Sequence, residues 1–280
     1  TIVTGVQTCA LPILDHSSPP RRPLSTASLV LRLACIGGVV AVVAGAFAYV
    51  NGTFDPQRLQ PKTLVNALET NNGVHPGFRR NHAKGVCVAG YFESSSEARA
   101  YSSAQVFNAA KTPLIGRFAL PSGNPYAPDG SVPIRSFAVQ FSQANGQQWR
   151  TGMNSMPVFP VGTPEAFYQM LKAGAPDPAT GKPNPANMPA FFAAHPEAAP
   201  FLAWVKTAKP SASYATETYN GINAFYLVGA DGKRQAVRWG VVPQSLDAAG
   251  DTAPAGSDFL EKDLIDRKST RLNSSHNSNL

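Results

Sequence analysis

Four polar side chains of this sequence are of types that together could act on a peroxide. His82 lies three residues after Arg79 and just before an apolar run, and Arg117 and Asn154 belong to further candidate strands. A histidine exchanges protons near neutral pH because its pKa lies close to that range. An asparagine amide can hold a peroxide without titrating, and arginines bind carboxylates such as haem propionates by charge-assisted hydrogen bonds. These residue types therefore indicate a haem pocket, but their spacing along the chain does not show that they meet.

Apolar runs predict the strands that must position these side chains. In Ile134–Phe141, Phe137 and Val139 alternate with small or polar residues, which is the period of a strand with one buried face. The dipeptide Asp231-Gly232 predicts a hairpin turn between the last two runs. The predicted strands are Val86–Phe92, Leu114–Ala119, Ile134–Phe141, Ile222–Val228 and Ala236–Val241.

Helix signals occur in other stretches of the chain. Thr163-Pro164 is a typical helix start, an N-cap residue followed by proline at the first helical position. Because strands and helices each come in runs, the sequence predicts an antiparallel α+β fold. The helical stretches are expected from Pro61, from Pro164 to Gly174 and over Pro196–Ala208, with Ser94–Ala110 partly helical and Pro176–Pro189 a loop.

An uncharged segment, residues 33–53, is long enough to cross a bilayer as a helix. Three arginines precede its core and Asp55 is the first charged residue after it, so the positive-inside rule places 14–32 in the cytoplasm and the rest across the membrane. In a bacterium with two membranes, this predicts an inner-membrane anchor with a periplasmic domain. A cleaved signal peptide, with small residues at 44–48, and a buried core helix are the alternatives.

Both ends of the sequence resemble translated sequencing adapters. Residues 1–13 and 266–280 are therefore set aside from fold reasoning. The predicted domain is 54–265, and we expect the C-terminal part of the protein to be missing after Ile265.

The charge distribution argues against nucleic-acid binding. Without Asp266, Arg267, Lys268 and Arg271, the formal net charge falls from +7 to +5. The basic residues are scattered and form no run that could follow a phosphate backbone. The sequence also lacks the Cys-x-x-Cys and His-Glu-x-x-His patterns of zinc sites, the Gly-x-Gly-x-x-Gly pattern of dinucleotide sites and the Gly-x-Ser-x-Gly pattern of serine hydrolases.

Cys87 has no cysteine downstream with which it could form a disulfide. Its place within an apolar run predicts a small core residue and not a nucleophile.

Several motifs, in order along the chain, resemble those of the haem catalase family. His82-Ala83-Lys84-Gly85 resembles the family's distal-histidine segment, with Arg79 at the matching position three residues earlier. The segments Leu114–Phe118, Arg135–Phe141, Asn154–Phe159 and Tyr219–Phe225 resemble the segments that follow in the family. The resemblance runs from about Val65 to Leu264, and the anchor and compact spacing are similar to the smaller catalase-related peroxidases.

This resemblance implies a catalase-like antiparallel β-barrel with flanking helices, incomplete here and preceded by one transmembrane helix. It implies an enzyme with haem b iron that reduces hydrogen peroxide or organic peroxides with a small organic donor and protects against oxidative stress. In that enzyme His82 would be the acid–base group, Asn154 would orient the peroxide, and Arg79 and Arg117 would bind the haem propionates.

The sequence departs from the family pattern beside the histidine and at the iron ligand. Asn81 stands where the family has an apolar residue, and Ala119 where it has a serine that hydrogen-bonds the distal histidine, so another group must orient His82. The family's iron ligand is a tyrosine with an arginine four residues before it. None of the eight tyrosines has that arginine, so we expect the ligand beyond Ile265 and this chain by itself to be inactive.

A second reading stays open on the same residues. The chain could be a membrane-anchored module that binds haem or a lipophilic ligand without turnover. Oxidation of a phenolic donor in the presence of peroxide would distinguish the enzyme from the binding module.

Overall fold

The computed structural model describes residues 25–55, 58–209, 211–244 and 256–277. The chain divides into two compact units, 1–58 and 59–280. The adapter-like segment 1–13 and most of the predicted cytoplasmic segment 14–32 lie outside the described residues, as do the last three residues of the adapter-like tail.

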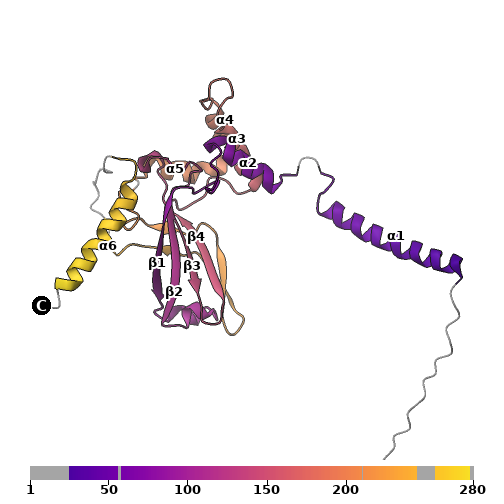
Figure 1. Ribbon diagram of the computed structural model, residues 1–280, viewed down its shortest axis with the longest axis horizontal. Coiled ribbons are helices and arrows are strands. Elements are labelled where there is room, and N and C mark those ends of the chain that lie inside the picture. Colours follow the sequence, from indigo (N-terminus) through magenta and orange to yellow (C-terminus); the bar gives the residue numbers. More distant parts are fainter. Residues whose placement is uncertain (1–24, 56–57, 210, 245–255, 278–280) are drawn as a thin grey trace, which may run out of the picture. The chain divides into compact units, whose positions relative to one another are not determined.

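The first unit contains helix α1, Thr26–Val50 (Figure 1). Ser25 caps the helix, because its side-chain oxygen accepts a hydrogen bond from the backbone N–H of Ser28 at 3.3 Å. None of its residues is buried. Within the described part of the chain, α1 is the one helix that is long and apolar enough to cross a membrane by length and composition. It begins and ends earlier than the predicted span 33–53.

The second unit is built on a curled antiparallel sheet with the strand order β1-β2-β3-β4-β5-β8 (Figure 1). A hairpin of β6 and β7 forms a separate two-stranded sheet, and its turn contains Gly232 with φ of +80°. The strands are β1 Gly85–Glu93, β2 Lys111–Ala119, β3 Ser136–Ser142, β4 Gln148–Asn154, β5 Tyr219–Asn220, β6 Phe225–Val228, β7 Arg234–Val237 and β8 Gly240–Val241.

Two strand predictions need correction. The predicted strand Ala236–Val241 is two strands, since β7 pairs with β6 whereas β8 pairs with β5. Asn154 was expected in a candidate strand, but β4 was not among the strands predicted with bounds, because only Trp149 and Met153 of its seven residues are apolar. Trp149, Thr151 and Met153 face the core, and the residues between them are polar or glycine.

The sheet has one packed face and one open face. On the packed face, Val139, Met153 and Tyr219 are buried and the rings of Phe118 and Phe137 stack at 4.2 Å between centroids. On the open face, the side chain of Ile115 in β2 is 60% exposed. Since alternate residues of a strand point to opposite faces, this division assigns every side chain of the four long strands to the core or to the open face.

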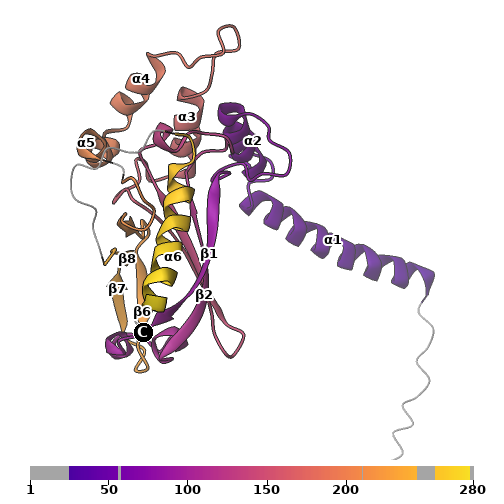
Figure 2. The same cartoon turned by 60° about the vertical axis from the view of Figure 1, so that its left-hand side comes forward.

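Four helices gather at the end of the sheet where β1 begins and β4 ends (Figures 1 and 2). Thr163 caps α3 as predicted, accepting a hydrogen bond from the N–H of Ala166 at 3.1 Å. Helix α4 was not predicted, and the expected loop Pro176–Pro189 runs into its first turn. The helices are α2 Pro61–Asn72, α3 Pro164–Ala173, α4 Asn187–Ala194 and α5 Ala199–Thr207, with short 3-10 turns at Glu97–Ala100, Gln105–Phe107, Asp129–Ser131 and Pro196–Ala198.

Helix α6, Phe259–Asn277, starts near the end of the sheet where the other helices gather and leads away from β1 toward the C-terminus (Figures 1 and 2). Its first residues, Phe259 and Leu260, are buried against Leu120 and Tyr214. The helix continues through Asp266, where the adapter-like tail was predicted to begin.

An ionic cluster holds the start of α6 to the loop that precedes β1. The Lys84 ammonium lies 2.7 Å from Asp129 Oδ1 and 2.8 Å from Asp258 Oδ1. The second oxygen of Asp129 accepts the backbone N–H of Leu260 at 2.8 Å. One buried carboxylate therefore binds both the lysine and the first turn of α6.

Candidate active site

The open face of the sheet presents its side chains in rows that cross the four long strands. The first row lies nearest the helices and consists of Gly85, Ala119, Ser136 and Asn154. The second row consists of Cys87, Arg117, Ala138 and Gly152, and the third of Ala89, Ile115, Gln140 and Arg150. Each row follows from the antiparallel register, because directly opposed residues share a face.

The second and third rows, apart from Ala89, form the floor of an open cavity of about 620 Å³, which Arg79 also lines. Cavities of roughly 300–1,000 Å³ are typical for small molecules and cofactors. Besides Arg79, the lining residues are Cys87, Ile115, Gly116, Arg117, Ala138, Val139, Gln140, Arg150, Thr151 and Gly152.

His82 stands at the edge of this face in a strained backbone conformation. Its φ is +55°, a left-handed value that costs a residue other than glycine about 1–3 kcal/mol. Hydrogen bonds hold it there, since its N–H donates to Asn81 Oδ1 at 3.0 Å and its carbonyl accepts from Arg117 Nη1 at 2.8 Å. Arg117 Nη2 also donates to the carbonyl of Ala83 at 3.1 Å. Arg117 therefore fixes the backbone on which the imidazole stands.

Electrostatics keep the His82 imidazole neutral. Burial lowers its pKa below the ordinary histidine value, and the positive charges of Arg117 and Arg79 lower it further. Within the described residues, no hydrogen bond uses either ring nitrogen. At neutral pH the ring can therefore accept a proton from a bound molecule.

Arg117 and Arg79 both line the cavity, as a carboxylate-binding role requires. Burial lowers the pKa of the Arg117 guanidinium, and the charge of Arg79, which lines the same cavity, lowers it further. Arg117 uses two of its five N–H groups for the carbonyls near His82, so the remaining N–H groups can bind a carboxylate.

Asn154 lies at the end of β4 on the same face, in the row next to that of Arg117. Its Oδ1 accepts a hydrogen bond from Ser136 Oγ at 2.5 Å. Among the described residues no hydrogen bond joins it to His82, and neither of these two residues lines the cavity. The structure thus gathers His82, Arg79 and Arg117, and places Asn154 at the adjoining end of the face.

The prediction that Cys87 is a core residue was wrong. It is exposed, it lines the cavity and it lies directly opposite Arg117. The reason is strand parity, because Val86 and Val88 face the core and the residue between them must point the other way.

Two further residues of this face were missed at the level of the sequence. Arg150 adds a third guanidinium to the cavity, and Ser136 contacts Asn154 directly. If β4 had been recognised, its alternation would have placed Arg150 on the same face as Asn154, two rows away.

The residues of the open face fit a haem. Haem is a flat apolar ring with two carboxylates, and the cavity combines three guanidiniums with the exposed side chain of Ile115. Ala138 and Gly152 have little or no side chain, so they leave space above the sheet for a flat ring. A Cβ added at Gly152 would meet no protein atom within 4 Å, which shows that this space is open. Arg79 and Arg117 would hold the carboxylates, Arg150 adds a third positive charge to the cavity, and Ile115 and Ala138 would contact the ring.

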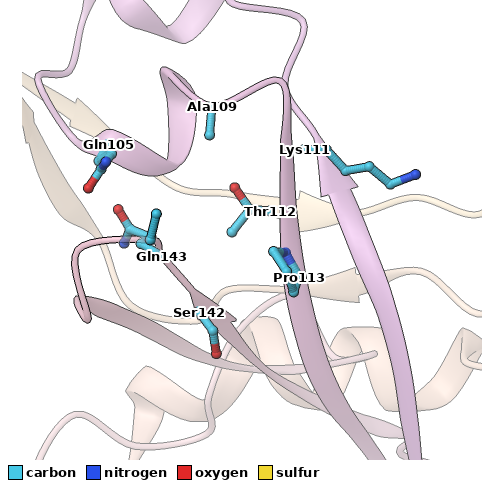
Figure 3. A pocket seen from close by; sticks show the side chains of 8 residues that line it. Gln105, Ala109, Lys111, Thr112, Pro113, Ser142 and Gln143 are labelled. Carbon is cyan, nitrogen blue, oxygen red and sulfur yellow. The ribbon is translucent and has the colours of Figure 1, made fainter.

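A second hollow, of about 240 Å³, lies toward the other end of the sheet (Figure 3). Gln105, Thr112 and Gln143 line it, together with Lys111 at the start of β2. None of the four predicted site residues belongs to it, so it is separate from the candidate site.

Comparison with known proteins identifies the family. Residues 49–270 match the family model of catalase. The chain is 36% identical over 244 residues to a catalase-related peroxidase of Synechococcus elongatus, covering 85% of this chain and 69% of the relative. It is 32% identical over 213 residues to a catalase-related peroxidase of Mycolicibacterium paratuberculosis, covering 75% of this chain and 67% of the relative.

Solved structures confirm the predicted fold. A bacterial catalase superposes with a TM-score of 0.56 at 22% identity, covering 76% of this chain and 43% of the catalase. A fungal catalase superposes with a TM-score of 0.61 at 19% identity, covering 77% of this chain and 45% of that one. The chain thus spans about two thirds of the two peroxidases and less than half of these catalases.

Proposed function

This chain belongs to the catalase family, and from that premise we propose that the protein containing it is a haem-dependent peroxidase. Its oxidant would be hydrogen peroxide or an organic peroxide, and its reductant a small organic donor. The two relatives named catalase-related peroxidase support a peroxide-degrading function. The donor and a role in oxidative stress are part of the proposal.

The observation that carries the proposal is the position of the His82 imidazole at the edge of a cation-lined cavity, on a backbone held by Arg117. The pKa of this imidazole is lowered by burial and by two arginines, so it is a base at neutral pH. In a peroxidase, such a base takes one proton from the peroxide and returns it to the departing oxygen. A histidine without these neighbours would be partly protonated in the same pH range.

The other residues bind and orient. Arg79 and Arg117 would hold the propionates of a haem b, and Asn154 would donate a hydrogen bond to the peroxide. When bound, the haem supplies the redox-active iron at which the O–O bond is cleaved. Arg117 has a second task, because its bonds to the carbonyls of His82 and Ala83 keep the base in place.

His82→Ala in the haem-loaded full-length protein tests this proposal. We expect the rate of peroxide consumption to fall about 100-fold or more, because positioned acid–base groups contribute roughly 10²–10⁴-fold. Haem content should stay unchanged, since the substitution spares the arginines. The measurement is the initial rate of oxidation of a phenolic donor, with haem quantified from the absorption spectrum.

His75→Ala is the matched control. His75 belongs to the same connection between α2 and β1, but its ring contacts Asn72 and Tyr126 and does not line the cavity. It should keep the wild-type rate. Equal rates for His82→Ala and wild type would contradict the assignment, and haem uptake without any turnover would favour a binding module instead.

We also propose that α1 anchors the protein in the bacterial inner membrane, with the haem domain, residues 54–265, in the periplasm. The length and apolar composition of α1 support an anchor, although a signal sequence has the same properties.

A further inference from the structure

Ser136 is the hydroxyl-bearing residue of the row that contains Asn154. It is the first residue of β3, its side chain is only 6% exposed, and it lies directly opposite Asn154. Its Oγ donates a hydrogen bond to Asn154 Oδ1 at 2.5 Å. On its other side, the row continues with Ala119, which has no polar group to offer.

The backbone around this pair is held firmly. Ser155 donates its N–H to the carbonyl of Arg135 at 2.8 Å, and its Oγ accepts the N–H of Arg135 at 3.0 Å. The amide of Asn220, on the neighbouring strand β5, donates to the carbonyl of Ser155 at 3.1 Å. The backbone of Asn154 is therefore fixed between β3 and β5, and only the torsion angles of its side chain can still vary.

The bond from Ser136 removes much of that freedom. An asparagine amide has an acceptor end and a donor end of almost equal size, and rotation by half a turn exchanges them. In the structure the serine hydroxyl donates to Oδ1 and so leaves Nδ2 free, and no hydrogen bond among the described residues uses Nδ2. The group that Asn154 presents is thus a donor, which is what a peroxide oxygen needs.

We infer that Ser136 is a positioning residue that fixes the amide of Asn154 with its donor end toward the bound peroxide. This inference rests on the proposed function, in which Asn154 holds the peroxide. Ser136 itself would not touch the substrate, and it would act only through Asn154.

The first test reads the amide directly and requires no turnover. In full-length protein labelled with 15N-asparagine, the side-chain NH₂ signal of Asn154 is assigned by its loss in Asn154→Asp. Ser136→Ala should shift and broaden this signal, because the amide can then rotate. Ser136→Thr, which keeps a hydroxyl, should restore it. Ser142→Ala is the control, since Ser142 is on the same strand and face but is exposed and distant.

The second test measures the bimolecular rate of the haem-loaded protein with hydrogen peroxide. Ser136→Ala should lower this rate about fivefold, since a net hydrogen-bond contribution of about 1 kcal/mol corresponds to that factor. Threonine should recover most of it, and Ser142→Ala should match wild type. In an Asn154→Ala background, adding Ser136→Ala should change nothing further.

The outcomes separate the inference from the proposed function. An unchanged amide signal in Ser136→Ala would overturn the inference, and so would a fivefold loss that persists in the Asn154→Ala background. If the signal shifts as expected but wild type does not react with peroxide, the bond to Asn154 stands and the proposed function fails.

Discussion

At the scale of single residues, the protonation state of His82 depends on the positive charges beside it, which no nearby carboxylate in the described part of the chain offsets. His82 has two arginines as neighbours, and both lower the pKa of its imidazole. Among the described residues, no carboxylate acts on the imidazole in the opposite direction. A carboxylate partner would raise that pKa and favour the protonated ring. The absence of such a partner keeps the imidazole neutral and ready to accept a proton.

Replacing Arg79 should therefore change the pH dependence of the enzyme. The neutral form of His82 is the active base, so the rate falls as the pH drops through its lowered pKa. Arg79→Gln removes one of the charges that lower this pKa. The pKa should rise, while burial and Arg117 still hold it below the ordinary value, and the acid limb of kcat/KM for hydrogen peroxide should move to higher pH.

Arg80→Gln provides the comparison. Arg80 is the next residue, but it pairs with Glu69 at 2.8 Å and is not among the charges that act on His82. The acid limb of kcat/KM for the Arg80→Gln variant should coincide with that of the wild-type enzyme. A shift of equal size in both variants would mean that overall charge, and not the position of Arg79, determines the pKa of His82.

At the scale of elements, the segment from His82 to Lys84 is fastened to two other parts of the fold. Arg117 of β2 holds the carbonyls of His82 and Ala83, and Lys84 binds the Asp129 carboxylate that also receives the first turn of α6. Burial alone would lower the pKa of Lys84, but its hydrogen bonds to Asp129 and Asp258 outweigh burial and raise it. The lysine is therefore a permanent cation that joins α6 to the site.

Lys84→Met should destabilise the second unit clearly. It leaves Asp129, which is 1% exposed, without its cation. Removing one partner of a buried ion pair costs about 3 kcal/mol or more. For a domain of this size, that corresponds to a Tm lower by roughly 6–12 °C. Thermal unfolding followed by circular dichroism provides the measurement.

Asp258→Asn tests the exposed half of the same cluster. The Asp258 side chain is 49% exposed and solvent screens its charge, so its loss should lower the Tm much less than the loss of Lys84. If both variants melt at the same temperature, the burial of Asp129 is not what makes the cluster stabilising.

At the scale of the whole molecule, α1 forms a unit of its own, and the residues that could do chemistry all belong to the second unit. An apolar helix with no buried residue needs an apolar environment, because water would otherwise contact its entire surface. Under the proposed anchor, a bilayer would supply that environment.

The anchor can be tested with paired substitutions near the middle of α1. Arginine at Val39 and Val43 should release the protein from carbonate-washed membranes, since each buried arginine costs about 2.5–3.5 kcal/mol for insertion. Leucine at the same positions should leave it in the membrane fraction. The intact mass of the wild-type protein decides between the alternatives, because cleavage near residues 44–48 would identify a signal peptide.

The sequence alone was enough to predict the family, the α+β class and most of the elements. Strands β1, β2 and β3 were predicted because their apolar runs or period-two alternation are visible locally. The N-cap at Thr163 and the turn at Asp231-Gly232 have short-range signatures of the same kind. Strand β4 and helix α4 were missed because their local patterns are mixed or lie beside prolines.

The arrangement of the site was decided by the tertiary structure. Which face a strand residue occupies depends on the register with its neighbours, so Cys87 was expected in the core but lies beside Arg117 on the open face. In the same way, Ser136 and Asn154 are 18 residues apart in the chain and meet only because β3 and β4 pair in one register. Motifs specify residue types locally, whereas strand pairing is a long-range event that decides which of them share a cavity.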